Sequence, residues 1–135
     1  MDMIMAAREL SKQMQQDERY LNFMAAMKKT DEDEKLQQMI AEFNMKRQAY
    51  EFAANKGEMG DSFKTLETEV NTLYNNIMEN ETMANYNFAK AEMSSMLNAV
   101  MSIINQCAGG ADPDTVEPKE QSGCGGSCGS CGGCA

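Results

Sequence analysis

The sequence predicts an all-α protein, an antiparallel bundle of about five helices that forms dimers. Residues 1–108 contain no proline and are rich in Ala, Met, Leu, Glu, Gln and Lys, which lose little rotamer freedom in a helix. Apolar residues recur there at spacings of three and four, which places them on one face of a helix. At 135 residues the chain has room for one domain and a short appendage.

The first two predicted helices are short. The first runs to about Gln16, and Asp17 is placed to cap the second. Thr30 is expected to offer its hydroxyl as the cap of a third helix, with the acidic run 31–33 in the first turn. The expected apolar faces consist of Met3, Ala6, Ala7, Leu10 and Met14 in the first helix, and of Tyr20, Leu21, Met24 and Met27 in the second.

The third predicted helix ends at Lys56-Gly57, and residues 57–60 form a turn. Asp61 is then expected to cap a fourth helix. The inward stripe expected of the third helix is Leu36, Met39, Ile40, Phe43, Arg47, Tyr50, Ala53 and Ala54, and that of the fourth is Phe63, Leu66, Val70, Leu73, Tyr74 and Ile77.

The fifth predicted helix opens at Asn80 with Glu81 and is the most apolar of the five. From Ser94 to Ile104 its hydrophobic residues cover more than one stripe. A helix of this kind is buried on two sides, either in the centre of a bundle or at a subunit interface. The pattern therefore predicts a homodimer or a mixed oligomer.

Composition excludes several classes of function. A net charge of −9 repels phosphate backbones and anionic lipid, which disfavours direct binding of nucleic acid or of a membrane surface. The chain has no histidine, so mechanisms that use imidazole as a general base or metal ligand are absent. The pattern contains no phosphate-binding loop, no activated serine and no membrane span or signal peptide. We expect a cytoplasmic protein that is not an enzyme.

Composition changes abruptly at Gly109-Gly110. Residues 109–123 hold both prolines and are acidic, which predicts a flexible linker after a helical domain at 1–108. Residues 124–135 are mostly Gly and Cys and have too few side chains to fold unless a metal or a covalent bond organises them. The expected domains are therefore a helical body, a linker and a cysteine-rich tail that is either disordered or organised by metal.

The tail presents the candidate metal ligands. Their pattern is Cys124-x3-Cys128-x2-Cys131-x2-Cys134, and four soft thiolates at these spacings suit an iron–sulfur cluster, tetrahedral zinc or copper(I). A thiol–disulfide switch and an incidentally reactive tail are the alternatives. Cys107 falls in register with Val100 and Ile104, so it is either an inert buried thiol or a fifth ligand.

The helical body resembles the YlbF/YmcA family of small bacterial control-of-competence regulators over residues 1–108. The segments that carry the resemblance are AARELSKQMQQDERYLNFMAAMKKTDEDEKLQQMIAEFNMKRQAYE and LETEVNTLYNNIMENETMANYNFAKAEMSSMLNAVMSII. These are patterns of a helical family and contain no catalytic signature, so they specify fold more closely than function.

The resemblance implies an all-helical, dimer-forming adaptor without enzymatic activity. Cysteine-bearing members of the family join with each other and with YaaT in a complex that carries 4Fe-4S clusters, linked to RNase Y-dependent mRNA processing, competence, sporulation and biofilm formation. The matching candidates here are the tail cysteines Cys124, Cys128, Cys131 and Cys134, with Cys107 as a possible fifth ligand. This tail departs from the family pattern because one chain holds enough cysteines for a whole cluster.

Three hypotheses follow from the sequence. The leading one is a cytoplasmic helical adaptor whose tail holds a 4Fe-4S cluster and which acts with YlbF/YmcA/YaaT-like partners on RNase Y-type mRNA processing. The second is a metal-handling or thiol-redox protein, with zinc as another metal, in which the tail is the active element. The third is a helical interaction module whose tail has no specific role.

Overall fold

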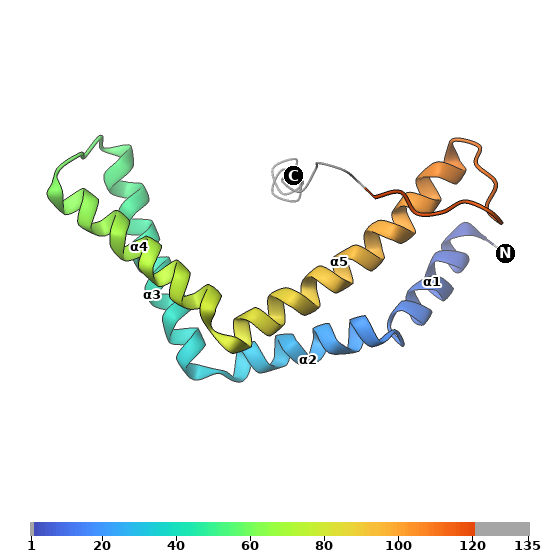
Figure 1. Cartoon of the computed structure of the whole chain (residues 1–135), viewed down its shortest axis with the longest axis horizontal. Coiled ribbons are helices and arrows are strands. Elements are labelled where there is room, and N and C mark those ends of the chain that lie inside the picture. The colour runs from blue at the N-terminus through green and yellow to red at the C-terminus, as the bar shows by residue number, and fades with distance from the viewer. Residues whose placement is uncertain (1, 121–135) are drawn as a thin grey trace. The chain divides into compact units, whose positions relative to one another are not determined.

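A computed structural model describes residues 2–120 of the chain and contains five helices over that range. They are α1 (Met3–Met14), α2 (Glu18–Glu32), α3 (Glu34–Asn55), α4 (Asp61–Glu79) and α5 (Glu81–Ala108), as Figure 1 shows. No strand occurs among the described residues, so the predicted all-α class is confirmed. The chain divides into two compact units, Met1–Met93 and Ser94–Ala135.

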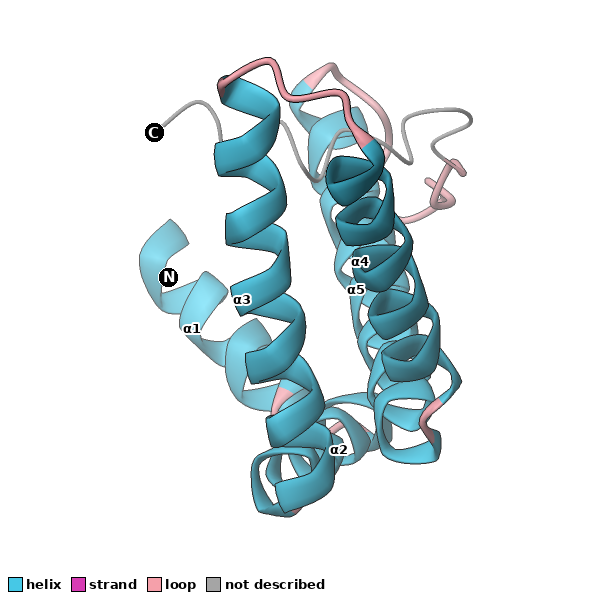
Figure 2. Cartoon of the chain, turned by 90° about the vertical axis from the view of Figure 1, so that its left-hand side faces the viewer, coloured by secondary structure: helices cyan, strands magenta, loops and turns pink. Residues whose placement is uncertain are grey.

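In the first unit, α3 and α4 lie side by side as an antiparallel hairpin (Figures 1 and 2). Two aromatic pairs connect the helices: Phe43 with Tyr74, ring centroids 6.0 Å apart, and Tyr50 stacked on Phe63 at 5.0 Å. Leu36, at the start of α3, is completely buried. Leu36, Ala53 and Ile77 of the predicted apolar faces are buried, whereas Tyr74 remains 48% exposed, so the prediction for these positions is confirmed in part.

Helix α2 packs beside the first part of α5 in the same unit. The Phe23 and Tyr86 rings meet there with centroids 5.7 Å apart, and Ala26 and Ala89 are buried. This arrangement creates a groove between α2 and α5.

The caps of α2 and α5 confirm two predictions, and the cap of α3 corrects one. The Asp17 carboxylate accepts a hydrogen bond from the Arg19 N–H at 2.8 Å, and Asn80 Oδ1 accepts one from the Met83 N–H at 3.1 Å. The prediction that Thr30 caps the third helix is wrong. Asp33 is the cap, because its carboxylate accepts a hydrogen bond from the Leu36 N–H at 3.0 Å, while the Thr30 hydroxyl donates to the Met27 carbonyl inside α2.

The turn after α3 forms where it was predicted. Gly57 has φ +74°, and the Glu58 N–H and Gly57 N–H donate to the Ala53 and Ala54 carbonyls, the double hydrogen bond that ends many helices. Helix α4 then begins at Asp61, but the capping position is Gly60 and has no side-chain hydrogen bond. The predicted role of Asp61 as a cap is therefore wrong by one residue. Its carboxylate lies in the first turn, where the positive end of the helix dipole stabilises a negative charge.

Helix α1 differs from the other helices of the first unit because it has no buried residue. The predicted apolar face, with Met3 and Leu10, is exposed, although Ala6 and Met14 are partly covered.

The second unit consists of the last turns of α5 and the residues that follow them. Helix α5 ends with Gly110 at φ +100°, whose N–H donates to the Cys107 carbonyl while the Ala111 N–H donates to the Gln106 carbonyl. Asp112 then forms a turn by accepting the Asp114 N–H on its side chain at 3.0 Å. None of the helices in the described part of the chain is long and apolar enough to cross a membrane.

Candidate interaction surface

The structure places one of the five predicted candidate ligands. Cys107 lies in the last turn of α5, and its side chain is partly exposed rather than buried. Cys124, Cys128, Cys131 and Cys134 lie outside the described residues, so their predicted role as ligands stays a prediction. Among residues 2–120, no group of three or more metal-ligating side chains gathers.

The second unit exposes an apolar stripe on α5. Leu97 is 41% exposed, Met101 50% and Ile104 48%, and their spacing of four and three places them on one helix face. Met96, on another face of the same helix, is buried. The sequence predicted burial of this segment on two sides, but the described residues of the second unit leave the apolar stripe uncovered.

The helix segment that carries the apolar stripe has no charged residue. No Asp, Glu, Lys or Arg occurs between Glu92 and Asp112, although charged residues make up 24% of the chain. Its flanking residues are small or neutral, with Ser94, Asn98 and Asn105 beside it. A helix face that meets water ordinarily carries charges, whereas the centres of protein interfaces are depleted of them. The composition of this face is that of an interface.

Residues 111–119, the return segment, run back along α5 on a different face. The Lys119 N–H donates to Ser102 Oγ at 2.9 Å, and Gln106 Nε2 donates to the Glu117 carbonyl at 2.8 Å. Ser102 is buried as a result. Ser102 and Gln106 are one turn apart and, at 3.6 residues per turn, lie away from the apolar stripe. The return segment therefore leaves that stripe open.

The electrostatics of the first unit centre on a bidentate ion pair at the start of α2. Arg19 Nε and Nη2 donate to the two oxygens of Asp17 at 2.9 and 2.8 Å. The hydrogen bonds from the Arg19 side chain and backbone lower the pKa of Asp17 to about 2. The hydrogen bond with Asp17 in turn raises the pKa of Arg19, and Glu92 contributes in the same direction. The guanidinium is thus held at one place on the surface of α2.

Sequence reasoning missed the hydrogen bonds of the return segment. The predicted linker begins there, and its acidic, proline-containing composition gave no sign of contact with α5. The available signals were local: Gly110 as a helix terminator, and the Asp-Pro-Asp turn that reverses the chain. The partners on α5, a serine and a glutamine one turn apart, have no distinctive pattern.

Comparisons with known proteins agree with the fold. The model of the family "Control of competence regulator ComK, YlbF/YmcA" matches residues 3–107. The chain is also similar to a chain in the crystal structure of Bacillus subtilis RicA in complex with RicF, with a TM-score of 0.72 and 21% sequence identity, over 77% of this chain and 90% of that one. No curated protein matches it.

Proposed function

The chain belongs to the YlbF/YmcA family of control-of-competence regulators, and from this premise we propose that it is a cytoplasmic, non-enzymatic adaptor. It acts by assembling with another helical protein of the family through the apolar stripe of α5. The observation that carries the proposal is the exposure of Leu97, Met101 and Ile104 on a face without a single charge. The similar chain from Bacillus subtilis was crystallised in a complex of RicA with RicF, which supports a role in assembly.

The physical reason is the hydrophobic effect. Burying a large aliphatic side chain stabilises a contact by about 1.5–3 kcal/mol relative to leaving it exposed. Because the stripe itself carries no charged residue, a partner can cover its side chains without desolvating an ion on that face. An uncharged helix face on the partner is the matching surface.

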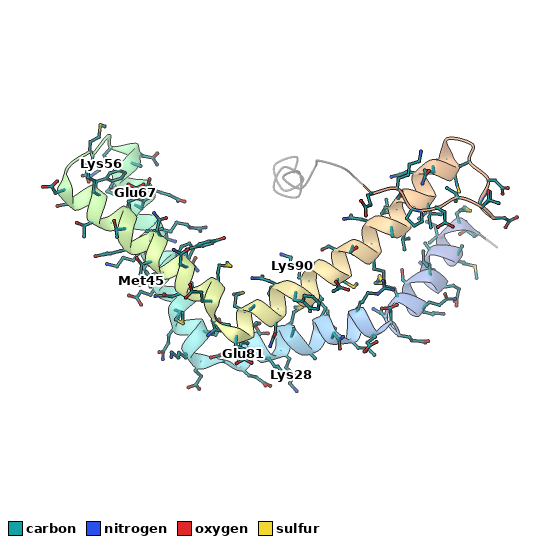
Figure 3. The ribbon with its side chains drawn as sticks, viewed as in Figure 1. Lys28, Met45, Lys56, Glu67, Glu81 and Lys90 are labelled. Carbon is teal, nitrogen blue, oxygen red and sulfur yellow. The ribbon has the colours of Figure 1, made fainter. Side chains whose placement is uncertain are left out.

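The test compares how strongly wild type and the Met101→Lys variant capture the host's other YlbF-family and YaaT-like proteins. A lysine in the centre of an apolar contact is expected to weaken capture at least about tenfold, equal to ~1.4 kcal/mol. Met45→Lys is the matched control, because Met45 is an exposed methionine on α3 (Figure 3). Equal capture by the two variants would contradict the assignment of this surface.

The cofactor part of the proposal rests on the donor set of the tail. Cys124, Cys128, Cys131 and Cys134 supply four thiolates, a number that fits a 4Fe-4S cluster and equally a structural zinc. The family resemblance favours the cluster. When bound, the cluster makes assembly responsive to iron and oxygen, since both decide whether it is present.

This part is tested on protein purified without oxygen, by iron and acid-labile sulfide analysis with a visible spectrum. Cys128→Ser/Cys131→Ser is expected to lose iron and sulfide while its helicity is unchanged. Cys107→Ser is the matched control and keeps both, because four thiolates complete the cluster without it. Full metal content in the double variant would refute the ligand assignment.

We place the complex in RNase Y-type mRNA processing, with competence, sporulation or biofilm formation as the affected process. The net charge of −9 disfavours direct contact with RNA, so the adaptor acts through its protein partners. Transcript-end mapping in cells that carry Met101→Lys is expected to reproduce the processing defect of a deletion strain. Normal processing in that strain would separate the chain from this pathway.

The second candidate function is metal handling or thiol redox exchange by the tail, and the clustering of four cysteines within eleven residues favours it. In that case the helical body is a carrier, and the tail gives up its metal or exchanges disulfides. Turnover in a disulfide-exchange assay, or transfer of zinc to a chelator at a rate unaffected by Met101→Lys, would support this function over the adaptor.

A further inference from the structure

Met101 lies in the middle of the apolar stripe and brings to it a thioether sulfur. The side chains of Leu97 and Ile104 are hydrocarbons, so this sulfur is the one atom of the three side chains that mild oxidants attack. Met101 is 50% exposed, whereas Met96, on another face of the same helix, is 9% exposed. Because oxidation of sulfur side chains follows their exposure, Met101 is open to oxidants at the centre of the stripe.

The neighbours of Met101 suit an oxidised side chain. Asn98 and Asn105 lie three residues before and four residues after it, a spacing that makes side chains neighbours on a helix surface. Both are exposed, and each amide has two N–H donors. An amide already meets a thioether elsewhere in the chain, where Asn87 Nδ2 donates to Met78 Sδ at 3.6 Å. A sulfoxide oxygen is a stronger acceptor than a thioether, so the free chain accommodates it without unfolding the helix.

We propose that Met101 is a site of reversible oxidation by peroxides, and that its sulfoxide weakens the contact made by the apolar stripe. A lone pair of the Met101 sulfur attacks one oxygen of hydrogen peroxide, so that an S–O bond forms as the O–O bond breaks. The sulfur loses two electrons and the peroxide gains them. The departing hydroxide takes the proton of the transferred oxygen and leaves as water. A methionine sulfoxide reductase reverses the change, with a thiol as the reductant.

The sulfoxide changes the free energy of the contact because it is polar. In the free chain its oxygen accepts hydrogen bonds from water and from the neighbouring amides, and an apolar partner face that covers it removes those from water without replacing them. The inference rests on the proposed function, since the apolar stripe must be the contact for its oxidation to weaken capture. It does not involve the cysteines of the tail, so it adds a response to peroxide that is separate from any metal bound there.

Exposure alone does not single out Met101, because other methionines of the chain are more exposed. Met45 on α3 is 71% exposed, and Met59 in the turn after α3 is 84% exposed. Peroxide is expected to oxidise both. Neither belongs to the apolar stripe, so their sulfoxides leave that surface unchanged. Met45 is therefore the matched reference for an oxidised methionine outside the proposed contact.

The first test measures the oxidation itself. The full chain is treated with hydrogen peroxide while its thiols are held as glutathione mixed disulfides, and is then digested with trypsin. Met101 and Met96 fall in one peptide, residues 91–119, so fragment masses compare them directly. Met101 is expected to gain an oxygen several-fold faster than Met96, with an unchanged circular dichroism spectrum of the treated chain. Equal rates at the two methionines would overturn the proposal.

The second test measures capture of the YlbF-family partner. Dithiothreitol frees the thiols after peroxide treatment, and every sample is reloaded with iron and sulfide, so that only the methionines differ. Capture by each variant is divided by its own capture before treatment. Wild type and Met45→Leu are expected to lose capture at least about tenfold. Met101→Leu, whose side chain is apolar and has no sulfur, is expected to give a ratio near one.

The reductase completes this test. Methionine sulfoxide reductase with dithiothreitol is expected to restore capture by treated wild type, because it returns the Met101 sulfoxide to the thioether. A loss of capture in Met101→Leu equal to that in wild type would assign the effect to another residue. That result, or a wild-type loss that the reductase does not reverse, would overturn the proposal.

Untreated Met101→Lys separates this inference from the proposed function. If Met101→Lys captures the partner weakly while peroxide-treated wild type captures it normally, the apolar stripe is the contact and only the inference about oxidation is wrong. If untreated Met101→Lys captures the partner as well as wild type does, the apolar stripe is not the contact, and the proposed function and the inference are both overturned.

Discussion

The α3–α4 hairpin and the last turns of α5 both carry large apolar residues, but only in the hairpin does a second helix bury part of them. In the hairpin, Leu36 is buried and two aromatic pairs connect the helices. The hairpin also carries charges, including a 2.8 Å ion pair that joins Lys46 of α3 to Glu69 of α4. The last turns of α5 leave Leu97, Met101 and Ile104 exposed, and residues 93–111 carry no charge.

The difference between the two regions indicates which apolar residues serve folding and which serve association. Helical spacing of apolar residues predicts a buried face in both regions and does not say what buries it. Charge is the distinguishing feature, because a solvated face needs charged side chains and a face awaiting a partner excludes them. We therefore expect the hairpin to determine stability and the apolar stripe to determine assembly.

The largest expected effect compares the same substitution in the two regions. Leu36→Ala leaves a cavity in a buried site and is expected to lower the free energy of unfolding by about 2–5 kcal/mol. Leu97→Ala removes the same atoms from an exposed position and is expected to change it by less than about 0.5 kcal/mol. Urea denaturation followed by circular dichroism measures both.

Partner capture is expected to show the opposite order of effects. The Leu97→Ala variant captures partners more weakly than wild type, whereas Leu36→Ala captures them about as well as wild type at denaturant concentrations below its unfolding midpoint. Similar losses of stability in the two variants would mean that the apolar stripe is covered within the folded chain.

The features that the sequence predicted correctly are those that depend on neighbouring residues. Asp17, Gly57 and Asn80 were assigned correctly because caps and turns depend on neighbours within a few residues. Thr30 was chosen over Asp33 because two good capping residues lie three positions apart, and only the length of α2 decides between them.

Contacts between distant residues show the opposite limit. The α2–α5 groove depends on contacts between residues about sixty positions apart, and the return segment depends on Ser102 and Gln106 meeting backbone groups. Neither has a local pattern. For the cysteine tail the sequence supplies the ligand chemistry, and the assignment of Cys124, Cys128, Cys131 and Cys134 stays a prediction.

The next effect sharpens the account of the hairpin. In a double-mutant cycle of Tyr50→Ala and Phe63→Ala, the stacked rings are expected to couple by about 0.5–1.5 kcal/mol. The matched cycle pairs Tyr50→Ala with Phe52→Ala, whose ring packs on Lys56 instead, and a coupling near zero is expected. Equal coupling in the two cycles would show that the stacking does not hold the hairpin together.

A smaller, local effect tests the other region. Ser102→Ala removes the acceptor of the Lys119 N–H, and a hydrogen bond of this kind contributes about 0.5–1.5 kcal/mol. The Lys119 amide is expected to exchange with solvent about tenfold faster, while the hairpin amides keep their rates. Ser95→Ala, on an exposed position of α5, is the control. Unchanged exchange at Lys119 would mean that Ser102 does not hold the return segment.

The smallest expected effect is a response to low pH, because the hairpin carries a hydrogen-bonded carboxylate and the apolar stripe carries none. The hydrogen bond from the Leu36 N–H, followed by that from Thr82, lowers the pKa of Asp33 below its ordinary 3.8. A lowered carboxyl pKa stabilises the folded state fully above 3.8, and this stabilisation is lost as the pH falls through the pKa of the folded protein. Residues 93–111 contain no carboxylate side chain, so no carboxylate titrates on the apolar stripe itself.

The Leu36 amide resonance is therefore expected to shift below pH 3.8 and the Ile104 resonance to stay constant. Asn is also a good cap but does not titrate, so Asp33→Asn should abolish the shift at Leu36 while the helix start is kept. A shift that persists in Asp33→Asn would assign the acid sensitivity to another group. Equal shifts at Leu36 and Ile104 would mean that the two regions respond to acid as one unit. The proposed separation between a hairpin that determines stability and a stripe that determines assembly would then be wrong.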